Sequence, residues 1–157
     1  KVDIIRADLD LYTEEEIIRL GLNIAAEMQE AAPRGTPVDT GWARANWVPS
    51  IGTPFAGPDK KDPTPADVAA RQKVQDQGLN DVLGWRNNDG PIFVSNNVPY
   101  INRLNEGHSQ QSPAGFVQAG IERAVRETKA SARQKSLRNT RASAYRAQRA
   151  NPKGRRP

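Results

Sequence analysis

The residues whose types and spacing suggest catalysis most directly are Asp39-Thr40-Gly41, the tripeptide that carries the catalytic carboxylate in aspartic proteases. That chemistry needs an apolar strand leading into the tripeptide and a later strand of two apolar residues and a glycine to support it. Here Arg34-Gly35-Thr36-Pro37 precedes the tripeptide, and only Val82-Leu83-Gly84 loosely offers the later strand. We therefore interpret the tripeptide as a turn, in which Asp39 or Thr40 bonds nearby backbone amides and Gly41 adopts a conformation closed to larger residues.

The adjacent pair His108-Ser109 suggests a serine-type triad completed by one of the many acidic residues. However, no Gly-x-Ser-x-Gly elbow surrounds Ser109, and adjacent side chains usually point apart, so we interpret residues 106–109 as a polar loop. The acidic run from Glu14 to Glu16 is typical of a helix start. With no cysteine and one histidine, the sequence excludes thiolate and multi-histidine metal sites, and it has no phosphate-binding glycine loop. We expect no catalytic residue, no metal and no cofactor.

Charge divides the chain into two parts. Residues 1–121 contain 11 Lys and Arg against 16 Asp and Glu, a net charge of −5, whereas residues 122–157 contain 12 against 2, a net charge of +10. Beyond Val125 the only large apolar residues are Leu137 and Tyr145, so residues 126–157 cannot bury a core of their own. We therefore divide the chain of 157 residues into a domain over 1–127 and a basic extension over 128–157. No apolar run approaches the roughly 18 residues that span a bilayer, and the first residues lack a signal-peptide pattern, so we expect a soluble protein without membrane contact.

The basic extension is a candidate surface for contact with a partner or with DNA. Full neutralisation of duplex phosphates by nine of its cations, from Arg133 onward, predicts a log–log salt slope of about −8, but an acidic protein surface satisfies the same charges equally well. No DNA-binding motif supports the reading of base sequence. The nine residues are Arg133, Lys135, Arg138, Arg141, Arg146, Arg149, Lys153, Arg155 and Arg156.

In the first half of the chain, residues 2–11 alternate partly between apolar and polar types, which favours a strand, with an extended arm as the alternative. Thr13 as N-cap and Glu16 three residues later predict a helix over about 14–31, which Pro33 stops. Trp42 and Trp47 would lie on opposite faces of a single strand, so one of them should start a bend or short helical turn. The prolines of residues 52–65 predict an exposed loop.

In the second half, residues 66–77 predict a short helix ended by Gly78, residues 91–97 a strand, and residues 98–104 a short helical turn entered through proline. Ser112 as N-cap and Pro113 at the first helical position predict the start of the last helix. This helix can continue past residue 145, although no apolar stripe attaches it to the rest of the protein beyond about residue 130. Its apolar face consists of Phe116, Val117, Gly120, Ile121, Ala124 and Val125.

Four segments in a fixed order resemble a known family. They are Pro37-Val38-Asp39-Thr40-Gly41, then Ala43-Arg44-Ala45-Asn46-Trp47, then residues 92–100 ending in Tyr100, and then residues 104–117, which contain Glu106-Gly107-His108-Ser109-Gln110-Gln111-Ser112-Pro113-Ala114-Gly115. Together they are similar to the neck, or tail-completion, proteins of tailed bacteriophages. The resemblance covers roughly residues 14–127. Asn105-Glu106 shifts the family's usual Leu-Glu pair by one residue, and the basic extension lies outside the resemblance.

The resemblance implies an α+β fold in which a small antiparallel sheet is flanked by the first and last helices, and the elements predicted above agree with that class. It further implies a non-catalytic virion protein at the head–tail junction, present in the host cytoplasm during assembly. Such proteins form a homo-oligomeric ring that joins the head connector to the tail tube or tail terminator and lets DNA pass. The family-motif positions are Asp39, Thr40, Gly41, Trp47, Tyr100, Glu106, Gly107, Ser109, Gln111, Pro113 and Gly115.

Two hypotheses for the basic extension stay open. In a neck protein, strong binding to the passing genome would impede ejection, which favours docking of Arg133 to Arg156 on acidic neighbouring subunits over transient contact with duplex DNA. In the alternative, the protein is a small nucleic-acid-binding protein that uses the basic extension, and the acidic domain is a spacer or dimerisation unit. Loss of duplex affinity on removal of residues 128–157 would distinguish the second hypothesis.

Overall fold

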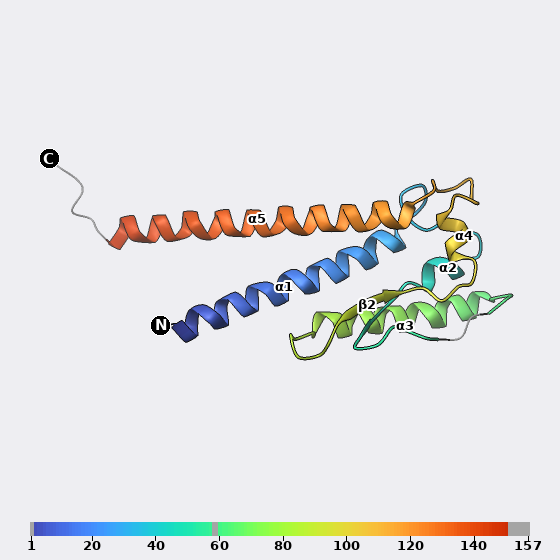
Figure 1. The fold of residues 1–157 in the computed structure, drawn as a ribbon, viewed down its shortest axis with the longest axis horizontal. Helices are drawn as coiled ribbons and strands as arrows, with labels where there is room; N and C mark the ends of the chain where they lie inside the picture. Colours follow the sequence, from blue (N-terminus) through green and yellow to red (C-terminus); the bar gives the residue numbers. More distant parts are fainter. Residues whose placement is uncertain (1, 58–59, 151–157) are drawn as a thin grey trace.

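The computed structural model describes residues 2–57 and 60–150 (Figure 1). The chain forms an α+β fold with a two-stranded antiparallel sheet, as the sequence predicts. Its elements are α1 (Val2–Gln29), α2 (Trp42–Ala45), β1 (Val48–Ile51), α3 (Pro65–Leu83), β2 (Ile92–Ser95), α4 (Ile101–Asn105) and α5 (Phe116–Ala150).

The two strands pair from Val48 with Ser95 to Ile51 with Ile92, and α3 makes the connection between them. α3 packs against β1, α1 packs against β2 and α3, and α5 lies antiparallel along α1 (Figure 1). Buried side chains from these elements, including Met28, Val82 and Phe116, form the core. This packing places the segments before α2 and before α5 at the same end of the molecule (Figure 1).

The first helix differs from its prediction at the N-terminal end. Residues 2–11 are helical rather than extended, and Thr13 lies inside α1, so Thr13 is not an N-cap. A helix already formed over residues 14–29 gains one hydrogen bond for each residue added, and residues 2–13 contain neither proline nor glycine to stop it. The acidic run is therefore internal: the Glu14 carboxylate accepts a hydrogen bond from the Asn87 backbone amide at 2.9 Å, and Glu15 forms an ion pair with Lys135.

α3 begins as its sequence allows but does not end at Gly78. Thr64 is the N-cap in a reciprocal capping box with Asp67. A hydrogen bond from Lys60 at 2.5 Å, together with those from Thr64, lowers the pKa of Asp67 to about 2. Gly78 is buried in mid-helix, where an added Cβ would lie 2.1 Å from the Pro49 carbonyl oxygen of β1. The glycine therefore permits close approach of helix and strand, and the prediction that it ends the helix is wrong.

Several shorter predictions are confirmed. Trp42 begins the helical turn α2, β2 lies within 91–97, α4 follows Pro99, and α5 continues past residue 145. The described residues of the loop, 52–57 and 60–64, contain neither helix nor strand and are mostly exposed. On the predicted apolar face of α5, Phe116, Gly120 and Ala124 are buried, but Ile121 is 39% exposed and does not belong to it. None of the helices in the described ranges combines the length and apolar character needed to cross a bilayer.

Candidate functional site

The tripeptide Asp39-Thr40-Gly41 forms the predicted turn. The Thr40 hydroxyl accepts a hydrogen bond from the Trp42 backbone amide at 3.3 Å. Gly41 has φ of 86°, in the left-handed region that favours glycine, and it is the N-cap of α2. Asp39 is exposed, and Val82-Leu83-Gly84 forms the end of α3 rather than a strand. The turn therefore lacks the paired strands that support a catalytic carboxylate in aspartic proteases.

The segment before α5 is fastened to this turn through Gln111. The Gln111 side chain accepts a hydrogen bond from the Val38 amide at 2.8 Å and donates one to the Val38 carbonyl at 3.0 Å. The next residue, Ser112, is buried and donates to the Gly35 carbonyl at 2.8 Å. Two motif segments that lie about 70 residues apart in sequence are therefore in direct contact.

The two segments, together with residues 61–63, Tyr100 and Leu104, line an open hollow of about 540 Å³, which we call the motif hollow. Six of the family-motif positions contribute to its wall: Asp39, Thr40, Gly41, Tyr100, Ser109 and Gln111. The other lining residues are Pro37, Trp42, Ala43, Lys61, Asp62, Pro63 and Leu104. The wall thus carries two carboxylates, one lysine and the partly exposed ring of Tyr100.

The remaining motif positions have other places in the fold. Trp47 is buried in the core, where its indole N–H donates to the Thr36 hydroxyl at 2.7 Å. Glu106 and Pro113 are exposed on the loop before α5. Gly107 and Gly115 have φ of 90° and 77°, so they shape that loop in conformations that a larger residue would strain.

The N-terminus of α5 is capped by a residue that sequence reasoning missed. Ser112 and Pro113 precede the helix, which begins at Phe116, so the prediction that Ser112 is its N-cap is wrong. Instead, the Asn105 side chain accepts a hydrogen bond from the Val117 amide at 3.0 Å, and the Asn105 carbonyl accepts one from the Gly115 amide at 2.7 Å. Asn105 is the last residue of α4 and is 12 positions from Val117, so no short-range capping pattern identifies it.

His108 and Ser109 are engaged in local loop contacts. The His108 Nδ1 atom lies 3.1 Å from the Arg103 carbonyl oxygen, and the Ser109 hydroxyl accepts from the Gln111 amide at 3.2 Å. These contacts fit the polar loop predicted for residues 106–109. Across the described ranges, 2–57 and 60–150, no three His, Cys, Asp or Glu side chains gather in a way that could hold a metal ion.

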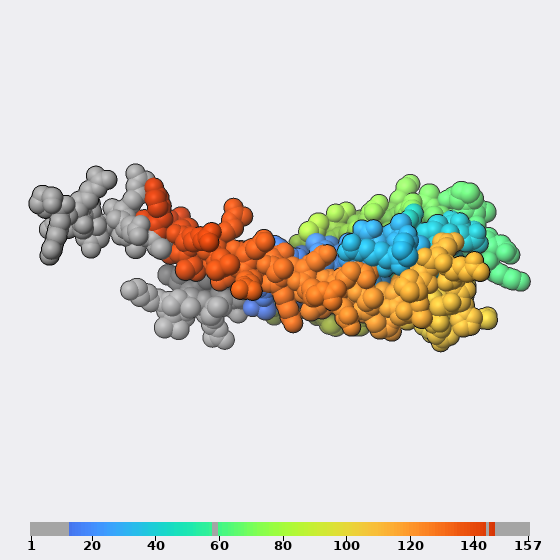
Figure 2. Space-filling view, turned by 90° about the horizontal axis from the view of Figure 1, so that it is seen from above, coloured from blue at the N-terminus to red at the C-terminus, as the bar shows by residue number. Residues whose placement is uncertain are grey.

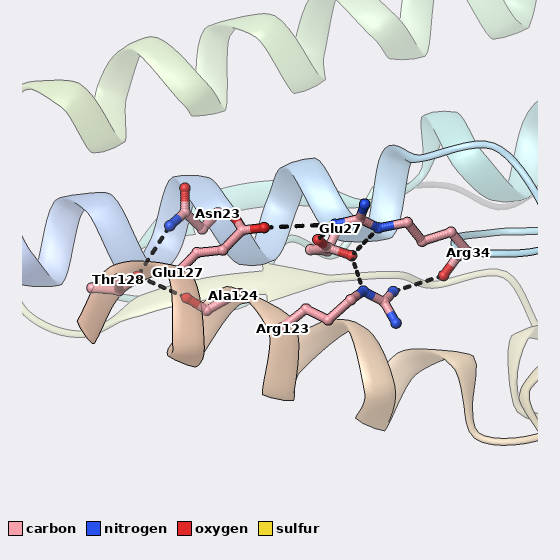
Figure 3. A network of polar contacts seen from close by, with 7 residues as sticks. All are labelled: Asn23, Glu27, Arg34, Arg123, Ala124, Glu127 and Thr128. Atoms are coloured by element: carbon pink, nitrogen blue, oxygen red, sulfur yellow. Dashed lines mark hydrogen bonds and ion pairs between the residues drawn. The ribbon is translucent and has the colours of Figure 1, made fainter. Parts of the chain in front are cut away.

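A partly buried ionic network joins α1 to α5 (Figure 3). The Glu27 side chain, 5% exposed, accepts hydrogen bonds from Arg34 and, at 2.6 Å, from Arg123. Arg123 also donates to the Arg34 carbonyl at 2.8 Å, which connects α5 to the turn after α1. Burial by itself raises the pKa of Glu27, but the two guanidinium groups outweigh it, so the pKa lies below its ordinary value. The network therefore links α1 and the turn that follows it to α5.

The basic extension continues α5 without a break at residue 127 (Figure 1). Arg133, Arg138, Arg141 and Arg146 are exposed, whereas Lys135 is half-buried against Glu15 of α1. Arg149 is on the helix but the position of its side chain is not described, and Lys153, Arg155 and Arg156 lie outside the described residues. Both views show the C-terminal part of α5 extending beyond α3 (Figures 1 and 2), and Figure 1 shows that it also extends beyond the sheet.

Comparison with protein-family models, with curated proteins and with solved structures found no match to this chain. The function proposed below is therefore supported by the sequence motifs and by the geometry that brings them together.

Proposed function

We propose that this chain is a structural protein of the neck of a tailed bacteriophage, where identical subunits form a ring that joins the head connector to the tail tube. The observation that carries the proposal is the contact between Gln111 and Val38. Two motif segments that resemble the neck family, each short by itself, are fastened together and line one hollow. An unrelated chain with accidental matches has no reason to place them in contact.

The shape of the subunit supports a role in assembly. The core-forming elements leave two features exposed, namely the proline-rich loop and the C-terminal part of α5. In the proposed ring, subunits pack side by side around a channel that lets DNA pass, and these two features reach the rings above and below. This role requires neither catalysis nor a cofactor.

The test is complementation in a host that expresses the remaining phage genes. Particles assembled without this chain are scored by electron microscopy for tails attached to filled heads, and the chain is then supplied from a plasmid. We expect separate heads and tails without the chain and joined particles with it. Normal, infectious tailed particles in its absence would contradict the proposal.

A second candidate, a small nucleic-acid-binding protein, is favoured by one observation. Every described side chain of α5 from Ser136 onward is exposed, and three of these residues are arginines: Arg138, Arg141 and Arg146. Exposed cations without a folded recognition motif bind duplex phosphates in a sequence-independent and strongly salt-dependent way. Measurement of duplex affinity before and after removal of residues 128–157 decides between the candidates, because only the second requires that affinity.

A further inference from the structure

The C-terminal part of α5 is a charged surface that its own chain does not neutralise. We define the basic arm as residues 129–146. Its sequence contains no Asp or Glu. Of its cations, Lys135 pairs with Glu15, whereas Arg138, Arg141 and Arg146 form no ion pair with any part of the chain that the structure describes.

The motif hollow is a second surface with charged groups that the described part of the chain does not pair, and its net charge is negative. Asp39 and Asp62 are exposed on its wall, and within the described residues neither carboxylate takes part in a hydrogen bond or ion pair. Lys61 is the single cation among the lining residues, so the wall has a net negative charge. Tyr100, a residue that is 40% exposed, lies on the same wall. Carboxylates beside an aromatic ring are the combination that binds a guanidinium group.

The arm cannot reach the hollow of its own chain. The hollow adjoins the segment that leads into α5, and α5 is one continuous helix that points away from it (Figure 1). At about 1.5 Å per residue, Arg141 lies about 38 Å along the helix from Phe116. Contact between the two surfaces therefore requires two copies of the chain.

We propose that the basic arm of one copy docks in the motif hollow of a second copy, with arginine side chains against the carboxylates of Asp39 and Asp62. This contact rests on the proposed function, because it would form between neighbouring subunits of the proposed ring. Because the two surfaces differ, the contact is head-to-tail, and repeated head-to-tail contacts close into a ring when the rotation between copies allows. The contact between the basic arm and the motif hollow is therefore one subunit interface of the proposed ring.

A second copy fits the arm better than nucleic acid does. Leu137 and Tyr145 are 52% and 61% exposed on the arm, and burial of such apolar surface stabilises protein association, whereas phosphate contacts do not need it. Residues 1–121 have a net charge of −5 and would repel a duplex brought close to them.

The test measures binding of a fluorescently labelled peptide of residues 128–157 to the full chain by anisotropy at low salt. We expect saturable binding that the paired variant Asp39→Asn and Asp62→Asn weakens about tenfold, the effect of two partly desolvated charge pairs. The matched control is Asp76→Asn with Asp81→Asn, which removes the same charge from the exposed side of α3 and should leave affinity unchanged. A charge exchange, Asp39→Lys and Asp62→Lys in the chain with Arg141→Glu and Arg146→Glu in the peptide, should restore binding.

Equal weakening by both pairs of variants would overturn the proposal, because it would show attraction to net charge alone. The proposal also fails if the peptide does not bind while a labelled duplex binds the full chain and loses affinity with Arg141→Glu and Arg146→Glu. The peptide assay and the complementation assay together distinguish failure of this proposal from failure of the neck function. If the peptide does not bind, but heads and tails stay separate without the chain, only the docking contact is contradicted. If the peptide binds, but normal tailed particles form without the chain, only the neck function is contradicted.

Discussion

Gln111 supplies both hydrogen-bond partners of the Val38 backbone, an acceptor at 2.8 Å and a donor at 3.0 Å, across 73 residues of sequence. A neighbouring strand would satisfy an extended residue in the same way, but here one side-chain amide does so. The link fixes the distance between the turn at Asp39-Thr40-Gly41 and the loop before α5, and hence the shape of the motif hollow.

We predict that Gln111→Ala destabilises the fold by about 1–2 kcal/mol, because two hydrogen bonds are lost and the Val38 groups must find water. The measurement is urea unfolding followed by tryptophan fluorescence, since Trp42 and Trp47 lie near the affected segment. Gln110→Ala, at an exposed position one residue earlier, is the matched control and should change stability little. Equal stabilities for the two variants would show that the Gln111 link contributes nothing.

Asn105→Ala should cost about 1 kcal/mol, because the Val117 amide at the start of α5 loses its side-chain acceptor. Asn105→Asp should retain most of the stability, since a carboxylate accepts the same hydrogen bond and its charge is favourable at a helix N-terminus. Thermal unfolding followed by circular dichroism measures both. Asn102→Ala, exposed on the same short helix, is the control, and a loss of stability as large as that of Asn105→Ala would refute the capping role.

Local sequence patterns predicted the elements whose structure depends on residues adjacent in the chain. β2 follows a turn and contains β-branched and aromatic residues, and the Asp39-Thr40-Gly41 turn depends on a hydroxyl and a glycine next to each other. The family resemblance selected residues that prove to share one hollow, such as Tyr100 and Gln111. These features could be predicted because each is encoded by a few residues that are adjacent in the sequence.

The features that the sequence could not predict depend on partners distant along the chain. The sequence predicts that Gly78 ends a helix, but in the structure Gly78 lies in mid-helix against the Pro49 carbonyl. The sequence predicts that Ser112 is an N-cap, but in the structure Asn105 caps the helix. The Glu27 network likewise draws on Arg34 and on Arg123, which is 96 residues away. At Gly78 and Ser112 a tertiary contact overrides a valid local propensity, and at Glu27 the partner from α5 leaves no local signal at all.

Gly78→Ala should destabilise the protein by roughly 1–3 kcal/mol, although alanine is the better helix former, because its Cβ would collide with the Pro49 carbonyl and force β1 away from α3. Gly84→Ala is the matched control: Gly84 follows the same helix with φ of −86°, and an added Cβ would lie 3.5 Å from the nearest atom, the Asp81 carbonyl oxygen. Urea unfolding should separate the two variants. An unchanged or increased stability for Gly78→Ala would contradict the close approach of helix and strand.

The Glu27 network should make stability depend on pH in the acid range. Because the pKa of Glu27 is lower in the folded protein than its ordinary value of 4.5, the stabilisation by its carboxylate is complete above about pH 4.5 and is lost as the pH falls through the folded-state pKa. Glu27→Gln should remove this part of the dependence and, at neutral pH, should destabilise the protein by about 1.5–3 kcal/mol, the contribution of a hydrogen bond to a charged group.

The measurement is urea unfolding of wild type, Glu27→Gln and Glu30→Gln at intervals from pH 7 down to pH 3. Glu30 is exposed at the end of the same helix, so its variant controls for the removal of one carboxylate. Because Glu30→Gln keeps the bonds from Arg34 and Arg123 to Glu27, it should follow the wild-type decrease below about pH 4.5, whereas the stability of Glu27→Gln should fall less steeply. Parallel curves for the two variants would mean that the buried carboxylate does not contribute to acid unfolding, and that α5 is held to α1 by apolar packing around Met28 and Ala124 instead.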